Sequence, residues 1–316
     1  MNKKKRLMPY IGYGKPNTII LMGSVLYSSA VKDAKKEDSK WRNSKKMLQL
    51  FLAKPTVNEQ VTILFHNHSK TITTDKNGYF KTTLQLTSEI KAGWHSVSYY
   101  LNKDTPFEVS AENKCIIIDE SVSLGVISDI DDTIVVSHSH RYRKKIWTAL
   151  SKNAMTRKPN KTLSKFYNKL RPDKNPFFYV SSSERNLYGF WSHFMKTNNF
   201  PSGPLLLKEL KYGFTDFIFS GKGKHHHKYE KITGILDFYP FLSFILVGDN
   251  GQKDVEIYHS IVLNFPERIK SIFIVPTVDK RLNKKIVADC KKHNVNILTI
   301  NNSIESLNNA LKEACL

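Results

Sequence analysis

From about residue 116 onward, short apolar segments of strand length alternate with amphipathic segments of helix length. The expected strands are residues 124–130, 177–181, 214–219, 243–247, 271–275 and 296–300. The expected helices are residues 161–170, 184–195, 226–236, 253–264, 280–293 and 303–313. Strands and helices that alternate along a chain favour right-handed βαβ units and a parallel sheet covered on both faces. We therefore expect an α/β domain built on a parallel sheet in this part of the chain.

The chain before residue 116 has short segments of alternating polarity, rich in β-branched and aromatic residues. The expected strands are residues 17–27, 57–65, 79–86 and 94–101. The turn-forming residues 75–78 predict a hairpin between residues 70–74 and 79–83. The pattern is typical of a β-sandwich of about 100 residues. The highly charged residues 31–46 form either a solvated loop or an exposed helix.

A length of 316 residues suggests two domains. We place their boundary near residue 118. Residues 1–118 then form the β-sandwich-like domain, and residues 119–316 form the α/β domain.

The formal net charge of +21 arises from 49 Lys and Arg against 28 Asp and Glu. Such an excess predicts attraction to polyanions, whether nucleic acids, phosphorylated metabolites or an anionic membrane, without choosing among them. The three cysteines, Cys115, Cys290 and Cys315, are far apart and form no CxxC motif, which fits a reducing compartment. There is no signal-peptide core and no apolar segment of membrane-spanning length. We expect a cytoplasmic protein that contacts membranes only peripherally, if at all.

The strongest chemical signal is the segment 125–133, in which an apolar strand ends in Asp129-x-Asp131-x-Thr133. Carboxylates two residues apart at the end of a parallel strand lie where such sheets place their ligands. Magnesium prefers oxygen ligands and keeps water and substrate phosphate in its coordination shell. The alternative interpretation is a simple turn after a strand, where Asp is common.

A second acidic pair follows the apolar residues 243–247. Gly248 permits a tight turn, and Asp249 comes directly after it. A phosphoryl-transfer site needs a further metal-binding carboxylate from another strand, which favours a functional role for Asp249. Asp254 begins a predicted helix, so it either caps that helix or contributes to the site.

Hydroxyl and ammonium groups lie between the two acidic pairs. The apolar residues 177–180 lead into Ser181-Ser182-Ser183, where hydroxyl and backbone N–H groups at a strand-to-helix junction can hold phosphate oxygens. Lys228 follows three histidines, residues 225–227, at a predicted helix start, where it can neutralise phosphate and carboxylate charge. Imidazole is a poor ligand for magnesium, so we interpret the histidines as substrate-contacting or merely polar.

The order acidic pair, hydroxyl, lysine, acidic pair resembles the haloacid dehalogenase (HAD) superfamily of phosphotransferases. This resemblance implies a HAD-like Rossmannoid parallel sheet domain, preceded here by the β-sandwich domain. Within it, the chain is similar to the actin-patch phosphatidate phosphatase family over about residues 120–280. The segments that carry this resemblance are SDIDDTI (128–134), ALSKNAMTR (149–157), NPFFYVSSS (175–183) with residues 186–188, PSGPLLLKEL (201–210), HHHK (225–228) and ILVGDNGQKDVEIY (245–258). Two departures bear on substrate preference: Glu184-Arg185 follow the serines where Pro is common, and His226 stands where Asp is frequent.

The resemblance implies a role for each matching residue. Asp129 is the nucleophile that forms an aspartyl-phosphate, and Asp131 is the general acid and then the general base. Ser181 and Lys228 complete the catalytic set by binding phosphoryl oxygens. The implied substrate-binding residues are Thr133, Ser182, Arg185 and Asn186. The implied magnesium site comprises Asp129, Asp131 (through its backbone carbonyl), Asp249 and Asp254, the last of which orients either Lys228 or the metal shell.

Substrate choice is expected to depend on residues 135–173, an insertion where the superfamily often carries a small cap. Its cations are Arg141, Arg143, Lys144, Lys145, Lys152, Arg157 and Lys158. Tyr142, Ile146, Trp147 and Leu150 share one side of a helical pattern, which either lies on an anionic lipid surface or packs on the catalytic domain.

Three functions fit these features. The first is a phosphatase that converts phosphatidate to diacylglycerol. The second is a phosphatase of the same mechanism that acts on a soluble or nucleic-acid-end phosphate. The third is a non-catalytic binding protein that keeps the fold, which the intact acidic set speaks against. We favour the first, with no nucleic-acid partner.

Overall fold

The computed structural model describes residues 3–29, 54–101, 111–135, 158–209, 226–251, 253–279, 281–301 and 303–314. The chain divides into two compact units, one formed mainly by Met1–Asp119 and the other mainly by the chain from Glu120 onward. The charged residues 31–46, the predicted strand 214–219 and residues 136–157 of the predicted insertion lie outside the described residues.

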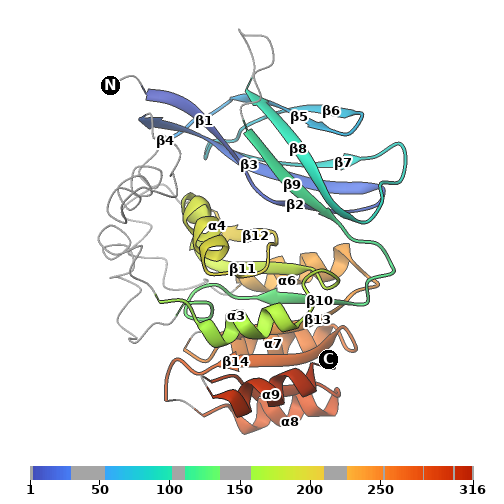
Figure 1. Ribbon diagram of the computed structural model, residues 1–316, viewed down its shortest axis with the longest axis vertical. Helices are drawn as coiled ribbons and strands as arrows, with labels where there is room; N and C mark the ends of the chain where they lie inside the picture. Colours follow the sequence, from blue (N-terminus) through green and yellow to red (C-terminus); the bar gives the residue numbers. More distant parts are fainter. Residues whose placement is uncertain are drawn as a thin grey trace. The chain divides into compact units, whose positions relative to one another are not determined.

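The first unit is a β-structure. Its strands are β1 (Lys3–Pro9), β2 (Gly12–Lys15), β3 (Thr18–Ser29), β4 (Lys54–Pro55), β5 (Gln60–Phe65), β6 (His68–Thr73), β7 (Tyr79–Gln85), β8 (Gly93–Leu101) and β9 (Ala111–Ile117). They follow the order β1-β3-β2-β9-β8-β5-β6, with β4 and β7 paired to β3 (Figure 1). Buried and exposed residues alternate along β7, as they do on a strand with one face in a core. This arrangement confirms the expected sandwich-like region.

The predicted hairpin between residues 70–74 and 79–83 is wrong. The turn itself forms, because Gly78 N donates to Asp75 O at 2.9 Å and Asp75 N donates to Tyr79 O at 2.8 Å. However, β6 pairs with β5, and β7 pairs with β3. The two-residue turn at His66 and Asn67 makes the β5–β6 hairpin instead, and β7 matches the long β3 over seven residue pairs.

The second unit contains a six-stranded parallel sheet in the order β12-β11-β10-β13-β14-β15. Its strands are β10 (Leu124–Ser128), β11 (Phe177–Glu184), β12 (Leu205–Lys208), β13 (Ser243–Asp249), β14 (Ile269–Val275) and β15 (Asn296–Thr299). Its helices are α3 (Lys161–Lys169), the 3-10 turn η1 (Arg185–Leu187), α4 (Tyr188–Thr197), α6 (His226–Phe238), α7 (Asp254–Asn264), α8 (Lys284–Lys292) and α9 (Ile304–Glu313). The alternation of strands and helices confirms the predicted α/β class (Figure 1).

Helices cover both faces of this sheet. Phe177 and Phe178 are successive residues of β11, so their side chains point to opposite faces. The ring of Phe177 lies 5.2 Å from that of Tyr167 on α3, whereas the ring of Phe178 lies 5.6 Å from that of Tyr239, just after α6. Both faces are therefore buried, which explains why these strands are apolar throughout rather than alternating.

Element boundaries differ from the predictions at three places. Strand β11 continues to Glu184, and α4 begins only at Tyr188, after η1. The short strand β12, within the motif PSGPLLLKEL, was not predicted as a strand. Helix α8 begins at Lys284, where Asn283 caps it by accepting a hydrogen bond from Lys285 N. In the part of the chain that the structure describes, no helix combines the length and apolarity needed to cross a bilayer.

The core of the first unit depends on large buried side chains. Phe65 is fully buried, whereas Trp94 is 40% exposed. We expect Phe65→Ala to destabilise the protein by about 3–5 kcal/mol, because it removes a buried aromatic ring and leaves a cavity. Trp94→Ala, the matched control, should cost about 1 kcal/mol or less. Urea unfolding of the full chain, followed by circular dichroism, measures both. Equal effects of the two substitutions would contradict this core.

Candidate active site

Three neighbouring strands bring the predicted site residues together. Strand β10 lies between β11 and β13, and all three run parallel. Their carboxyl ends therefore meet at one edge of the sheet, which is where open α/β sheets bind ligands. Asp129 directly follows β10, Ser181 belongs to β11, and Asp249 ends β13.

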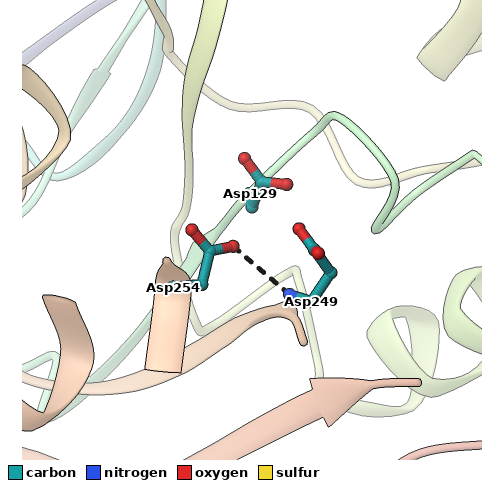
Figure 2. Close-up of side chains that lie close together, drawn as sticks. All are labelled: Asp129, Asp249 and Asp254. Carbon is teal, nitrogen blue, oxygen red and sulfur yellow. Dashed lines mark hydrogen bonds between the residues drawn. The ribbon is translucent and has the colours of Figure 1, made fainter. Parts of the chain in front are cut away.

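Three buried carboxylates form the centre of the site. Asp129, Asp249 and Asp254 each offer an oxygen, and these atoms lie within 4.8 Å of one another. Figure 2 shows the three side chains converging from β10, β13 and the first turn of α7. Each residue is at most 1% exposed. The buried cation beside them is Lys228 of α6, whose Nζ lies 2.7 Å from Asp129 Oδ1 and also binds Asp254 Oδ1.

These charges fit a divalent metal. Lys228 supplies one positive charge for three buried carboxylates, and burying uncompensated charge is costly. Hard oxygen ligands in this number suit magnesium, which takes a few carboxylates and completes its shell with water and phosphate. The trio that can share an ion contains Asp129, Asp249 and Asp254. The Asp131 carboxylate instead engages two serine hydroxyls, described below.

The surroundings of the buried ion pair raise the pKa values of both Asp129 and Lys228. Burial raises the pKa of Asp129 well above its ordinary value, and the carboxylates of Asp254, Asp249 and Asp131 raise it further, while Lys228 opposes the shift. For Lys228, burial alone would lower the pKa, but Asp129 and Asp254 outweigh it and raise it above the ordinary value. Lys228 is therefore a permanent cation at physiological pH.

Backbone and hydroxyl donors orient Asp249. Its Oδ1 accepts hydrogen bonds from Gly251 N at 2.6 Å and from Thr277 Oγ1 at 3.4 Å. Its own backbone N donates to Asp254 Oδ2 at 3.2 Å, the contact dashed in Figure 2. Gly248 permits this approach, because a Cβ there would lie 2.5 Å from Asp254 Oδ2. The end of β13 at Gly248 and Asp249 thus brings the side chains of Asp249 and Asp254 close together in a buried position.

Asn250, directly after β13, hydrogen-bonds to the loop that follows β14. Its Oδ1 accepts from Thr277 N at 2.8 Å and from Val278 N at 3.1 Å, and its Nδ2 donates to Val278 O at 2.9 Å. The loop that carries Thr277 is therefore held against the carboxylate cluster by one side chain.

Asp131 lies between two serine hydroxyls of β11. Ser181 Oγ donates to Asp131 Oδ2 at 2.5 Å, and Ser183 Oγ lies 2.8 Å from both Asp131 oxygens. Ser183 N also donates to Ser181 Oγ at 2.8 Å. The carboxyl group of Asp131 is thereby held near the carboxyl end of β11, and it is not one of the three clustered carboxylates.

The segment after β10 is held by its own side chains. Thr133 Oγ1 donates to Asp129 Oδ2 at 3.0 Å, and Asp132 takes a left-handed conformation with φ of 62°. Ser128 Oγ donates to Asp129 O at 2.6 Å and accepts from Tyr167 OH at 2.6 Å. The nucleophile candidate is thus fixed through its side chain and its backbone.

His227, whose side chain lies in the described part of the histidine segment, contacts the site. His227 lies 3.2 Å, through Nε2, from Ser181 O, so its Nε2–H donates to that carbonyl. Burial and the nearby Lys231, Lys208 and Lys228 lower the pKa of His227 to about 4. It is neutral at physiological pH and steadies the serine segment rather than adding charge.

The four implied substrate-binding residues have different surroundings. Thr133 contacts Asp129, as described above. Because side chains alternate along β11, Ser182 points away from the side that carries Ser181 and Ser183. Arg185 NH2 pairs with Glu209 at 2.9 Å, and Asn186 lies in η1. Substrate contacts of Ser182, Arg185 and Asn186 stay predictions, and the insertion cations 141–157 lie outside the described residues.

Several contributing residues were not predicted from the sequence. Ser183 could have been found from strand alternation, because it must share a side with Ser181. Ser128 and Asn250 directly adjoin Asp129 and Asp249 in the sequence, but their contacts with Tyr167 and with the loop after β14 depend on the fold. Tyr167 and Thr277 have no such signal, since they reach the site only through the packing of separate elements.

The second unit is an α/β domain with buried carboxylates at the carboxyl ends of adjacent parallel strands, which is the arrangement that the resemblance to HAD phosphotransferases implies. Residues 124–275 match the family model described as "Phosphatidate phosphatase APP1, catalytic domain". This match confirms the resemblance drawn from the motifs.

Curated relatives match the same region. Phosphatidate phosphatase APP1 of Saccharomyces cerevisiae is 30% identical over 184 residues, which are 58% of this chain and 30% of that protein. An uncharacterized protein of Schizosaccharomyces pombe is 23% identical over 194 residues, 56% of this chain and 31% of that protein. The chain therefore matches less than a third of the length of either relative. Among solved structures, a candidate HAD-like phosphatase from Mesorhizobium loti is 9% identical, with a TM-score of 0.41 over 61% of this chain and 86% of that chain.

The raised pKa of Asp129 predicts a stability effect in metal-free protein. A folded carboxyl with a raised pKa contributes stability that is present below the unfolded value near 4 and lost as pH rises through the folded value. Asp129→Asn removes this loss. In excess chelator at pH 8, we expect it to gain about 1 kcal/mol, or roughly 2–4 °C in melting midpoint. At pH 4 the gain should vanish. Differential scanning calorimetry tests this, and a variant less stable than wild type at pH 8 would contradict it.

Proposed function

We propose that the protein is a magnesium-dependent phosphatase that hydrolyses phosphatidate to diacylglycerol through an aspartyl-phosphate on Asp129. The observation that carries this proposal is the buried Asp129 carboxylate paired with Lys228 at 2.7 Å, at the carboxyl edge of the sheet. The match of residues 124–275 to the catalytic-domain family model supports the substrate class.

In the first step, the Asp129 carboxylate attacks phosphorus, and the bond between phosphorus and the lipid alcohol oxygen breaks. Asp131 gives its proton to that oxygen, so diacylglycerol leaves as a neutral alcohol. The hydroxyls of Ser181 and Ser183 keep the Asp131 carboxyl in one orientation for this transfer.

In the second step, water attacks the phosphorus of the aspartyl-phosphate. Asp131, now deprotonated, takes the proton of that water. The bond between phosphorus and the Asp129 oxygen breaks, which releases inorganic phosphate and restores the Asp129 carboxylate. One displacement is thereby divided into two easier ones.

The cations of the site lower the cost of bringing an anionic nucleophile to an anionic phosphate. Lys228 is fixed beside Asp129 by Asp254, so its charge needs no reorganisation during the reaction. Asp129, Asp249 and Asp254, together with the Asp131 backbone carbonyl, would hold the magnesium ion. Its chemistry there is to screen charge and orient the phosphoryl group.

The β-sandwich is assigned to residues 1–118 and the catalytic domain to residues 119–316, with a small cap at 135–173. A cytoplasmic protein in peripheral contact with anionic membranes fits the net charge of +21. A phosphatase that acts on a soluble or nucleic-acid-end phosphate would use the same chemistry and is the competing proposal.

The nucleophile is tested by Asp129→Asn, which keeps the size of the side chain and removes its attacking charge. We expect phosphate release from phosphatidate vesicles to fall by at least about 1,000-fold, because no covalent intermediate can form. Asp237→Asn, at an exposed carboxylate near the end of α6, is the matched control and should retain wild-type turnover. Comparable activity in Asp129→Asn and wild type would exclude the mechanism. Wild-type release from soluble phosphomonoesters but not from phosphatidate would favour the competing substrate.

The metal is tested by chelation. Excess EDTA should stop turnover, and magnesium should restore it better than calcium, whose longer and looser coordination positions phosphate poorly. Isothermal titration calorimetry should also show that Asp249→Asn weakens magnesium binding, because one of three carboxylate ligands becomes neutral. Full activity in chelator would rule out the proposed metal site.

A further inference from the structure

Strand β11 is irregular where it carries the serines of the site. Its pairing with β12 stops after Val180 and resumes only at Glu184, with a shift of register, so residues 181–183 lie in a bulge. Its pairing with β10 also ends before this segment, at Tyr179. Bulges beside active sites release backbone groups from the ladder and turn side chains toward new partners. The serine segment therefore interacts with the segment after β10, which carries Asp131.

The two serine hydroxyls and the Asp131 carboxyl form a closed ring of hydrogen bonds. Ser183 N donates to Ser181 Oγ at 2.8 Å, so the hydroxyl hydrogen of Ser181 is directed away from Ser183. That hydrogen is donated to Asp131 Oδ2 at 2.5 Å. Ser183 Oγ lies 2.8 Å from both Asp131 oxygens, so its hydrogen can bind either of them. Asp131 is only 8% exposed, so water competes weakly with these donors.

The Ser181 hydroxyl has a single hydrogen to donate, and two acceptors compete for it. In the structure this hydrogen goes to Asp131, whereas the role expected of Ser181 is to donate to a phosphoryl oxygen. Ser181 cannot make both bonds at once. Because Ser183 N holds the Ser181 oxygen in place, the hydrogen changes partner by rotation about the Cβ–Oγ bond. A bound phosphoryl group therefore takes the Ser181 hydrogen from Asp131, and the Ser183 hydroxyl stays.

This exchange decides which oxygen of Asp131 faces the reacting group. Ser181 contacts Oδ2, so Oδ2 is the oxygen that is released when the Ser181 hydrogen turns to the phosphoryl group. Ser183 then donates to Oδ1. A protonated carboxyl has one hydroxyl-like oxygen and one carbonyl-like oxygen, and the carbonyl-like oxygen is the better acceptor. A donor on Oδ1 therefore keeps the acidic proton on Oδ2, next to the phosphoryl group.

We propose that Ser183 is a positioning residue for departure of the alcohol, because it holds Asp131 Oδ1 after Ser181 has turned to the phosphoryl group. The Oδ2 proton then passes to the bridging oxygen as the bond between that oxygen and phosphorus breaks. The inference rests on the proposed aspartyl-phosphate mechanism and divides the work between two serines. Ser181 binds the phosphoryl group, and Ser183 orients the acid that protonates the leaving alcohol.

The leaving group makes this role measurable. The alcohol of diacylglycerol needs a proton as it departs, whereas para-nitrophenolate leaves as an anion. Loss of the Ser183 hydroxyl should therefore slow reaction of alkyl esters far more than that of para-nitrophenyl phosphate. The quantity to compare is kcat/KM, which runs from free enzyme to the departure of the alcohol. It excludes the later hydrolysis of the aspartyl-phosphate, in which Asp131 takes part with every substrate.

Ser183→Ala is compared with Ser260→Ala, a matched control that removes a half-buried hydroxyl of α7, where it donates to Glu256 O at 3.0 Å. The two esters are dibutyryl phosphatidate, which dissolves as single molecules, and para-nitrophenyl phosphate. Ser183→Ala should lower kcat/KM for the phosphatidate by about 10–100-fold, which is part of what general acid catalysis supplies. The loss on para-nitrophenyl phosphate should be smaller by about tenfold or more. Ser183→Thr, which keeps the hydroxyl, should restore the wild-type ratio of the two values, and Ser260→Ala should keep it.

Equal losses of kcat/KM on the two esters would indicate a general structural role for Ser183 and overturn the inference. A wild-type ratio in Ser183→Ala would overturn it as well, as would a folded Ser183→Thr variant that behaves like Ser183→Ala. If wild type hydrolyses para-nitrophenyl phosphate but not the phosphatidate, the proposed substrate fails. Glycerol 3-phosphate then takes its place as the alkyl ester, and the comparison still decides the role of Ser183.

A crystal structure of the wild-type protein with magnesium and orthovanadate, a phosphoryl analogue, tests the exchange without turnover. We expect Ser181 Oγ at hydrogen-bond distance from a vanadate oxygen and Ser183 Oγ still on Asp131. Vanadate beside Asp129 with Ser181 unmoved on Asp131 would overturn the inference alone and leave the proposed function standing. A site without vanadate, together with no turnover of any ester, would overturn the proposed function and the inference with it.

Discussion

The central constraint on this molecule is the burial of three carboxylates beside one lysine. Asp129, Asp249 and Asp254 repel one another in a medium that screens poorly, and Lys228 offsets only part of that repulsion. The surrounding groups are arranged to keep them there: Thr133 and Gly251 donate to two of the carboxylates, and Gly248 leaves room for a third. Such a cluster of like charges costs stability unless a cation neutralises it.

The parallel sheet is what makes this cluster possible. Strands β10, β11 and β13 are apolar and buried on both faces, so only their carboxyl ends are available to polar chemistry. Each strand delivers one part: the nucleophile candidate, the serine hydroxyls, and the second carboxylate. Helix α6 adds Lys228 from the next layer, and Asn250 ties the loop after β14 to the same centre. The site is thus shared among elements far apart in the sequence, with the sheet as the rigid frame.

Local patterns along the chain predict individual strands and helices, whereas strand pairing depends on contacts between distant residues. Strand-length apolar segments and amphipathic helices predicted the α/β sheet, because period and length are local properties. The predicted hairpin at residues 75–78 is wrong because a turn signal is also local. Which strands pair depends instead on which strand edges lie side by side in the folded sheet. The turn formed, yet β7 paired with β3. The predicted site residues include Ser182 but not Ser183. Strand alternation, however, places Ser183 on the same side as Ser181, where it contacts Asp131.

The sequence by itself determined the fold class of the second unit, the order of its acidic, hydroxyl and lysine motifs, and the family that this order resembles. These follow from residue types and spacing along one chain. Only the tertiary structure decided that Asp254 joins Asp129 and Asp249 rather than merely capping α7, and that Asp131 is held by two serines. Only it placed Thr277 against Asp249. Such contacts depend on strand order and loop packing, which bring together residues whose separation in sequence carries no information about their distance in space.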